Sequence, residues 1–162
     1  MLEELLALGH TGAEYDAHLI RINDGDQFGS GFVEVNPNSK IPALMDHSTE
    51  PPIRVFESGA ILLYAAEKTG TLYGSNPRDR VEVQKWFALH LSGTLPLLGA
   101  LRQNPPMLPG AERICKVIDT HLADHEFFAP DFSIADLAFY PRIAAWAEDS
   151  LPVENYPNIM RW

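Results

Sequence analysis

Cysteine is almost absent from this sequence. The chain has 162 residues and a single cysteine, Cys115, so no disulfide can form within it. This excludes the disulfide-stapled folds of small secreted proteins and suits a reducing compartment, so we expect the chain to be cytoplasmic. Cys115 follows Ile114 on a stretch with helical spacing, and there it is expected to act as a small buried hydrophobe.

Positive charge is also scarce. Twelve Lys and Arg residues stand against 22 Asp and Glu residues, which gives a net charge of −10. Nucleic acids and anionic membrane surfaces are bound by clustered basic side chains, so we expect neither as a partner. No apolar run has the length of a membrane span. The acidic surplus is most simply a solvated surface.

The composition that remains is that of a globular protein with a substantial core. Hydrophobic residues make up 46% of the chain and charged residues 21%, which fits one domain or two small ones. The pattern changes near residue 70. We expect an α/β half over residues 1–70, a linker over 71–76 and an all-helical half over 77–162.

Hydrophobic spacing predicts the elements of the first half. Leu2, Leu5 and Leu6 recur at helical spacing and Gly9 ends the pattern, which predicts the end of a helix with no capping residue before it. The same reasoning predicts a strand over 14–22, a helical turn over 28–35, strands over 40–44 and 53–56 that pair as an antiparallel hairpin, and a well-buried helix over 57–68.

The segment 36–44 (Asn-Pro-Asn-Ser-Lys-Ile-Pro-Ala-Leu) is the first candidate binding element. Dense turn chemistry leads into a strand that has Pro42 near its start, where a missing N–H is tolerated. An ordinary edge strand is one interpretation. A cis bond between Ile41 and Pro42 is another, and it would point the main chain of Ile41 outward to pair with an extended peptide.

The second candidate is Glu57-Ser58, where a strand runs directly into a helix. The free N–H groups and the dipole of a helix N-terminus attract a carboxylate. The Glu57 carboxylate can separately bind an ammonium, so the pair suits an amino acid. A plain helix cap is the alternative.

The second half is predicted to be helical throughout. Asn76 and Pro77 form a cap and first turn, and Ser133 with Asp136 forms a capping box. Prolines prevent regular helix over 101–109. The expected inward positions are Val83, Trp86, Phe87, His90, Leu91, Ile114, Val117, Ile118 and Leu122, and residues 157–162 are expected to begin a last helix.

No metal site is expected. His121 and His125 have the i, i+4 spacing of two ligands on one helix, but no third ligand accompanies them, so a solvated helix face is the preferred interpretation.

Three segments together resemble the cytosolic glutathione transferases. Residues 36–44, 56–64 and 133–136 occur in that family with this order and spacing, and the opening through Gln27-Phe28 is most similar to the bacterial Nu class, whose members reduce disulfides with glutathione. The resemblance covers nearly the whole chain. It implies a thioredoxin-like half followed by an all-helical half, acting as a homodimer on glutathione and on an electrophile or a small disulfide.

The resemblance also implies roles for single residues. Ile41 is expected to pair its main chain with the cysteinyl part of glutathione, beside a cis Pro42. Glu57 and Ser58 are expected to hold the γ-glutamyl end. The remaining two candidates are Gln27 and Lys40, with Lys40 at the glycyl carboxylate.

The chain departs from the family at its start. Relatives have a strand and a thiol-activating loop before the helix that Met1 interrupts, so the first strand is expected to be missing and no catalytic residue is assigned. The sequence therefore predicts an N-terminally truncated glutathione-dependent transferase or disulfide reductase. The alternatives are a non-catalytic relative that binds glutathione or dimerises, and an inactive fragment.

Overall fold

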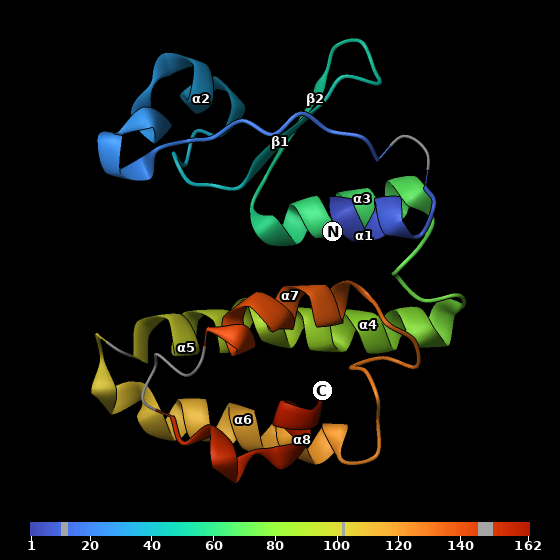
Figure 1. The fold of residues 1–162 in the computed structure, drawn as a ribbon, viewed down its shortest axis with the longest axis vertical. Helices are drawn as coiled ribbons and strands as arrows, with labels where there is room; N and C mark the ends of the chain where they lie inside the picture. The colour runs from blue at the N-terminus through green and yellow to red at the C-terminus, as the bar shows by residue number, and fades with distance from the viewer. Residues whose placement is uncertain (11–12, 102, 146–150) are drawn as a thin grey trace. The chain divides into compact units, whose positions relative to one another are not determined.

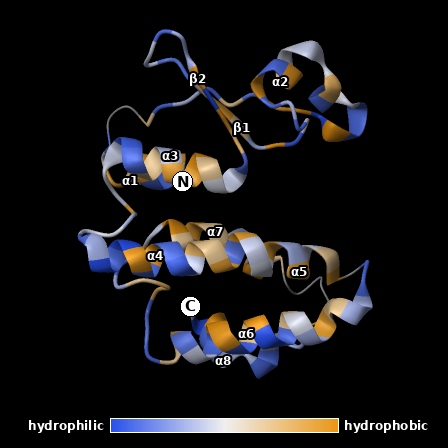
Figure 2. Ribbon diagram, turned by 180° about the vertical axis from the view of Figure 1, so that it is seen from behind, coloured by the Kyte–Doolittle hydropathy of each residue, from blue (hydrophilic) through white to orange (hydrophobic). Residues whose placement is uncertain are grey.

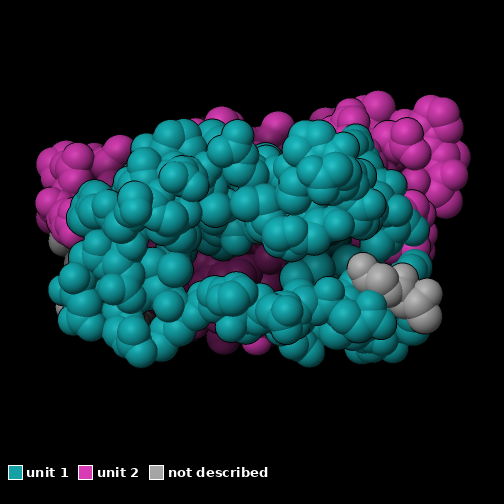
Figure 3. Space-filling model, turned by 90° about the horizontal axis from the view of Figure 1, so that it is seen from above, with its two compact units in different colours: residues 1–69 teal, residues 70–162 magenta. Residues whose placement is uncertain are grey.

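The chain forms two compact units. The computed structural model describes residues 1–10, 13–101, 103–145 and 151–162. Unit 1 comprises residues 1–69 and unit 2 comprises residues 70–162 (Figure 3).

Unit 1 is built around a two-stranded sheet. Its elements are α1 (Leu2–Ala7), η1 (Ile22–Asp24), η2 (Asp26–Phe28), α2 (Ser30–Val35), β1 (Ala43–Asp46), β2 (Ile53–Phe56) and α3 (Ser58–Thr69) (Figure 1). Strands β1 and β2 pair antiparallel, from Ala43 opposite Phe56 to Asp46 opposite Ile53, which confirms the predicted hairpin. The helical turn predicted before the hairpin is α2, and the helix predicted after it is α3, so both are confirmed.

The strand predicted over residues 14–22 is wrong. Residues 13–21 run outside every helix and strand, and Ile22 begins a 3₁₀ turn. Leu19 is 76% exposed and Tyr15 is 45% exposed, so the apolar positions of the alternating pattern do not cover a core. A strand exists only through a ladder with a neighbour, and no strand in the described ranges pairs with this segment.

The first strand of the hairpin also begins later than predicted. It starts at Ala43 instead of Lys40. Pro42 has no N–H to give to a ladder. The carbonyl of Lys40 is already taken, because it accepts a hydrogen bond from the side chain of Asn36.

Helix α3 is attached to the far end of β1 by a polar cluster. The Nζ of Lys68 and the hydroxyl of Tyr64 both donate to the Asp46 carboxylate. These bonds hold the pKa of Asp46 well below its usual range and raise the pKa of Tyr64 to about 12. The helix is less buried than predicted. Its fully buried residues are Gly59, Ala65 and Ala66.

Unit 2 is helical. Its elements are α4 (Pro77–Leu89), a π-helical turn η3 (His90–Thr94), α5 (Leu95–Leu101), η4 (Pro105–Met107), α6 (Leu108–Leu122), α7 (Ile134–Ala144), η6 (Val153–Asn155) and α8 (Pro157–Arg161). Asn76 accepts hydrogen bonds from the N–H groups of Arg78 and Asp79, as its predicted capping role requires. The proline-rich break between α5 and α6 is confirmed. Among the described residues, no helix has both the length and the apolar character that crossing a bilayer demands.

The core of unit 2 follows most of the predicted inward positions. Hydrophobic segments recur along α5, α6 and α7 (Figure 2), and the buried apolar side chains include Val83, Phe87, Leu98, Ile114, Ile118, Leu122, Phe128, Ile134 and Phe139. The predictions for Leu91 and Val117 are wrong, since they are 36% and 43% exposed. Leu91 lies in the π-helical turn, which breaks the regular 3.6-residue period. On α6 the inward stripe runs through Ala111, Cys115, Ile118 and Leu122 and bypasses Val117.

The predicted capping box is present and is buried at the edge of this core. Ser133 and Asp136 exchange hydrogen bonds at the start of α7. The buried Asp136 carboxylate also accepts from the N–H of Phe128 and from the Nε1 of Trp162. Burial raises the pKa of Asp136, and these hydrogen bonds act against that rise.

Candidate functional site

The candidate site lies where β1 begins and β2 ends. Ala43 is the register partner of Phe56 in the antiparallel pair, so the residues just outside the ladder, Pro42 and Glu57, are neighbours. The chain passes from β2 directly into α3 at this point (Figure 1). Four of the six predicted site residues, Ile41, Pro42, Glu57 and Ser58, are therefore brought together by the hairpin.

The bond between Ile41 and Pro42 is cis, as one of the two sequence interpretations required. Ile41 is 52% exposed. Its main chain lies before the first ladder residue of β1 and takes part in no backbone hydrogen bond that joins described residues. It therefore offers an unpaired N–H and C=O to an extended ligand.

The turn that precedes Ile41 is organised by Asn36, a residue that the sequence analysis treated only as part of a turn. Asn36 is 1% exposed. Its Oδ1 accepts from the N–H of Asn38 at 2.9 Å, and its Nδ2 donates to the carbonyl of Lys40 at 2.5 Å. The asparagine before a proline signalled a turn, but nothing in the sequence indicated that its side chain is buried.

Glu57 has an unusual backbone at the entrance to α3. Its φ of 69° lies in the left-handed region, which costs a non-glycine residue of the order of 1–3 kcal/mol. Its carbonyl accepts from the N–H of Ile61, and its Oε1 accepts from the Nδ2 of Asn38 at 3.2 Å. The carboxylate is exposed. Such outliers collect at ligand sites, where the surrounding structure holds them in place.

Ser58 is the first residue of α3, and its side chain is exposed. The first N–H groups of any α-helix have no partner within the helix, and the helix dipole adds positive potential there. This end of α3 therefore attracts a carboxylate, next to a Glu57 carboxylate that attracts an ammonium.

The two remaining candidates are less closely tied to this junction. The Lys40 side chain is exposed, and within the described residues it forms no ion pair. Gln27 lies in η2, and its buried Oε1 has no hydrogen-bond partner in the described part of the chain. No hydrogen bond among those residues joins Gln27 to the other five candidates, so its role stays a prediction.

Arg54 is held by a main-chain carbonyl of unit 1. Its Nη1 donates to the carbonyl of Glu34 at 2.6 Å and so links β2 to the end of α2. The groups available to a ligand are thus the Ile41 main chain, the start of α3, the Glu57 carboxylate and the Lys40 ammonium. That set suits a short peptide that carries an α-amino acid group at one end and a carboxylate at the other.

The single thiol of the chain does not belong to this site. Cys115 is fully buried in α6 of unit 2, and burial with the nearby Glu112 raises the pKa of its thiol to about 12. Such a thiol is a poor nucleophile.

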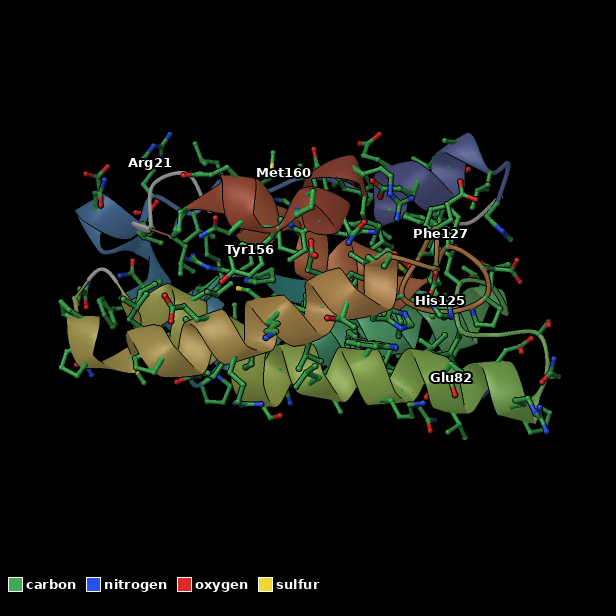
Figure 4. All side chains as sticks on the ribbon, turned by 90° about the horizontal axis from the view of Figure 1, so that it is seen from below. Arg21, Glu82, His125, Phe127, Tyr156 and Met160 are labelled. Atoms are coloured by element: carbon green, nitrogen blue, oxygen red, sulfur yellow. The ribbon has the colours of Figure 1, made fainter. Side chains whose placement is uncertain are left out.

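His121 and His125 belong to an aromatic stack. His121 stacks on His125 with 4.1 Å between ring centroids, and it packs against Trp86 at the same distance. His125 lies just beyond the end of α6 (Figure 4). The described residues contain no group of three side chains suited to holding a metal ion.

Comparison with known proteins gives one family match within the chain. Residues 5–68 match the model of the glutathione S-transferase N-terminal domain. The matched region contains all six predicted site residues.

Relatives match across the whole chain. It is 48% identical over its full length to the disulfide-bond oxidoreductase YghU of Escherichia coli, and the match covers 63% of that protein. It is 40% identical to an uncharacterised GST-like protein of Streptococcus mutans, of which it covers 70%. The solved structure of glutathione transferase YghU from Streptococcus pneumoniae, complexed with glutathione, superimposes with a TM-score of 0.91 at 37% identity, over 99% of this chain and 70% of that one.

Proposed function

Because the chain belongs to the glutathione S-transferase family, we propose that it binds glutathione at the junction of β1, β2 and α3 and uses it to reduce disulfides. Its fold is that of the family, with a thioredoxin-like first part and a helical second half. The relatives named above include a disulfide-bond oxidoreductase and a transferase complexed with glutathione, and both support the proposal.

One observation carries the proposal. The register of the hairpin sets Ile41, which is 52% exposed, beside Glu57 and the start of α3. Glutathione has an extended cysteinyl core with a γ-glutamyl amino acid group at one end. In the proposed complex the cysteinyl part pairs with Ile41, the γ-glutamyl carboxylate meets the N–H groups at Ser58, and its ammonium meets Glu57.

The other end of glutathione is a glycyl carboxylate. The exposed ammonium of Lys40 supplies the charge to bind it, and Gln27 is proposed as a further contact. In the reaction, the thiolate of glutathione attacks one sulfur of the disulfide and the other sulfur leaves as a thiol. A second glutathione then resolves the mixed disulfide, so two glutathione molecules are oxidised to one glutathione disulfide.

The reacting thiol belongs to glutathione and not to the protein, since Cys115 is buried in unit 2. The protein contributes orientation and charge. We assign no residue to the activation of the thiol. Transfer of glutathione to an electrophile is the same thiolate chemistry with a different acceptor. The whole scheme fits a reducing cytoplasm, where glutathione is available.

A homodimer is part of the proposal. Val81, Leu91 and Leu95 leave 52%, 36% and 39% of their surface exposed along α4, η3 and α5, and a second copy of the chain would cover such apolar side chains. Light scattering during size-exclusion chromatography tests it, with a mass near 36 kDa expected from twice the 18.0 kDa of one chain. A mass of one chain over the micromolar range would refute it.

The function is tested by binding and turnover together. We expect isothermal titration of the 162-residue chain with reduced glutathione to show saturable binding, and 2-hydroxyethyl disulfide to be reduced faster with the chain than with glutathione alone. Binding without turnover would favour the second candidate, a non-catalytic glutathione-binding protein. That candidate is kept because all six proposed site residues have binding roles and none is assigned to activation of the thiol. Absence of binding would refute both.

A further inference from the structure

Asn36 is the one polar side chain in the described part of unit 1 that is fully buried. The oxygen and the nitrogen of its side-chain amide both form hydrogen bonds with the turn that leads to Ile41. The Oδ1 accepts from the N–H of Asn38, and the Nδ2 donates to the carbonyl of Lys40. The main-chain carbonyl of Asn36 also accepts from the N–H of Ser39 at 3.0 Å.

The hydrogen bond to Lys40 determines where the N–H of Ile41 points. The carbonyl of Lys40 and the N–H of Ile41 belong to one planar peptide, and this peptide is trans, so the two groups point in opposite directions. Because the buried Asn36 amide draws the carbonyl inward, the N–H of Ile41 is directed outward. The exposure of Ile41 agrees with this orientation.

Asn38 extends the same turn to the other side of the site. Its N–H is held by Asn36, and its Nδ2 donates to the Oε1 of Glu57. The Glu57 carboxylate is therefore oriented by the turn that orients the main chain of Ile41. The buried Asn36 is thus connected by hydrogen bonds to both proposed ligand contacts, the Ile41 main chain through Lys40 and the Glu57 carboxylate through Asn38.

We propose that Asn36 and Asn38 are positioning residues with separable roles, an inference that rests on the proposed glutathione site. Asn36 aligns the Ile41 main chain for the cysteinyl part of the ligand. Asn38 holds the Glu57 carboxylate for the γ-glutamyl ammonium. A purely structural role for either residue would weaken binding only in step with loss of folded protein.

The test compares glutathione with glutaryl-cysteinyl-glycine, which differs from it only by the missing α-ammonium. Isothermal titration of the wild-type chain should show tighter binding of glutathione. Asn38→Ala should weaken glutathione binding by about five- to tenfold and leave binding of the analogue unchanged, because only the ammonium depends on Glu57. Asn36→Ala should weaken both ligands by a similar factor, because both use Ile41.

The matched control is Asn23→Ala, an exposed asparagine in η1 of the same unit, which should change neither affinity. Urea denaturation followed by circular dichroism gives the folded fraction of each variant, and a positioning role requires the loss of affinity to exceed what that fraction explains. If Asn36→Ala does not fold, Asn36→Asp replaces it, since aspartate keeps the acceptor for Asn38 and the size of the side chain, although it places a negative charge where the donor to Lys40 was. If neither Asn36 variant folds, its separate positioning role is overturned in favour of a structural one.

Three results would overturn the inference while leaving the proposed function intact. They are equal losses for both ligands in Asn38→Ala, no loss in Asn38→Ala, or wild-type affinity in a folded Asn36 variant. A wild-type chain that binds neither ligand is a different outcome, because it refutes the proposed function itself.

Discussion

Glu57 combines a left-handed backbone with an exposed carboxylate, which accepts one side-chain hydrogen bond from the described residues, that of Asn38. The carboxylate therefore has acceptor capacity left for a ligand, since an ionised carboxylate has about four lone-pair sites. Its position is set by the backbone of the β2–α3 junction. The charge of this one side chain, rather than its size, is what the proposed ammonium contact requires.

Glu57→Gln is accordingly expected to weaken glutathione binding by roughly 5- to 30-fold, because it keeps the shape and removes the charge of a charge-assisted hydrogen bond. Isothermal titration measures the change. Glu67→Gln, an exposed glutamate on the same helix, is the matched control and should bind as the wild type does. Equal affinities of Glu57→Gln and wild type would contradict the assignment of the ammonium to Glu57.

Cys115 allows a second test at this scale. Burial raises the pKa of its thiol to about 12, so almost none of it is thiolate at neutral pH. We expect Ellman's reagent to leave the native chain unmodified over minutes and to titrate one thiol per chain in denaturant. Disulfide reduction by Cys115→Ala should remain within about twofold of wild type. A large loss in a folded Cys115→Ala would mean that a protein thiol takes part in the reaction.

At the scale of elements, sequence patterns located the helices and the hairpin because the relevant signals are local. Asn76-Pro77 begins α4, and the Ser133–Asp136 capping box begins α7, through bonds between residues two or three positions apart. The cis bond at Pro42 was one of the two interpretations left open by a proline near the start of a strand, and the family resemblance favoured it. These features need no information from distant parts of the chain.

The errors concern features that hydrophobic and turn patterns do not determine. The alternation over residues 14–22 satisfies the strand pattern, but pattern alone supplies no neighbour to pair with. Burial of Asn36 depends on how the turn folds back over its own amide, and no spacing rule predicts that. Leu91 was placed inward by a 3.6-residue period that the π-helical turn interrupts.

The cap of α4 is expected to stabilise the folded chain. Asn76→Ala removes the acceptor of two otherwise unpaired N–H groups, so it should lower the free energy of unfolding by about 1 kcal/mol. Urea denaturation followed by circular dichroism measures it. Asn104→Ala removes an exposed asparagine that makes no such side-chain cap, and it should change stability by less than about 0.5 kcal/mol. Similar effects of the two substitutions would argue against the cap.

At the scale of the whole molecule, the two units distribute polar groups differently. The buried polar side chain of unit 1 serves the proposed ligand site, whereas those of unit 2 lie within its helical core. These are His90, Thr94, Ser133 and Asp136. Ser133 and Asp136 satisfy one another. His90 and Thr94 lie at the two ends of the π-helical turn, and the Nδ1 and Oγ1 atoms make no hydrogen bond to described residues.

His90 therefore links unit 2 stability to pH. Burial, reinforced by the nearby charge of Arg142, lowers the pKa of His90 from 6.5 to about 4. Between these two values the unfolded chain binds a proton that the folded chain does not. Stability is consequently complete above pH 6.5 and is lost as the pH falls from 6.5 toward 4, with a total loss of roughly 2–3 kcal/mol from this group.

Thermal or urea unfolding at a series of pH values between 7 and 4 tests this, with His90→Gln as the variant that cannot titrate. Burial lowers the pKa of His121 in the same direction, so only the difference between wild type and variant isolates His90. Whatever His90→Gln costs at neutral pH, its stability should fall less steeply on acidification, by roughly 2–3 kcal/mol over the range. The prediction rests on the burial of His90 beside Phe139, with 4.7 Å between ring centroids, and parallel stability curves for the two proteins would contradict it.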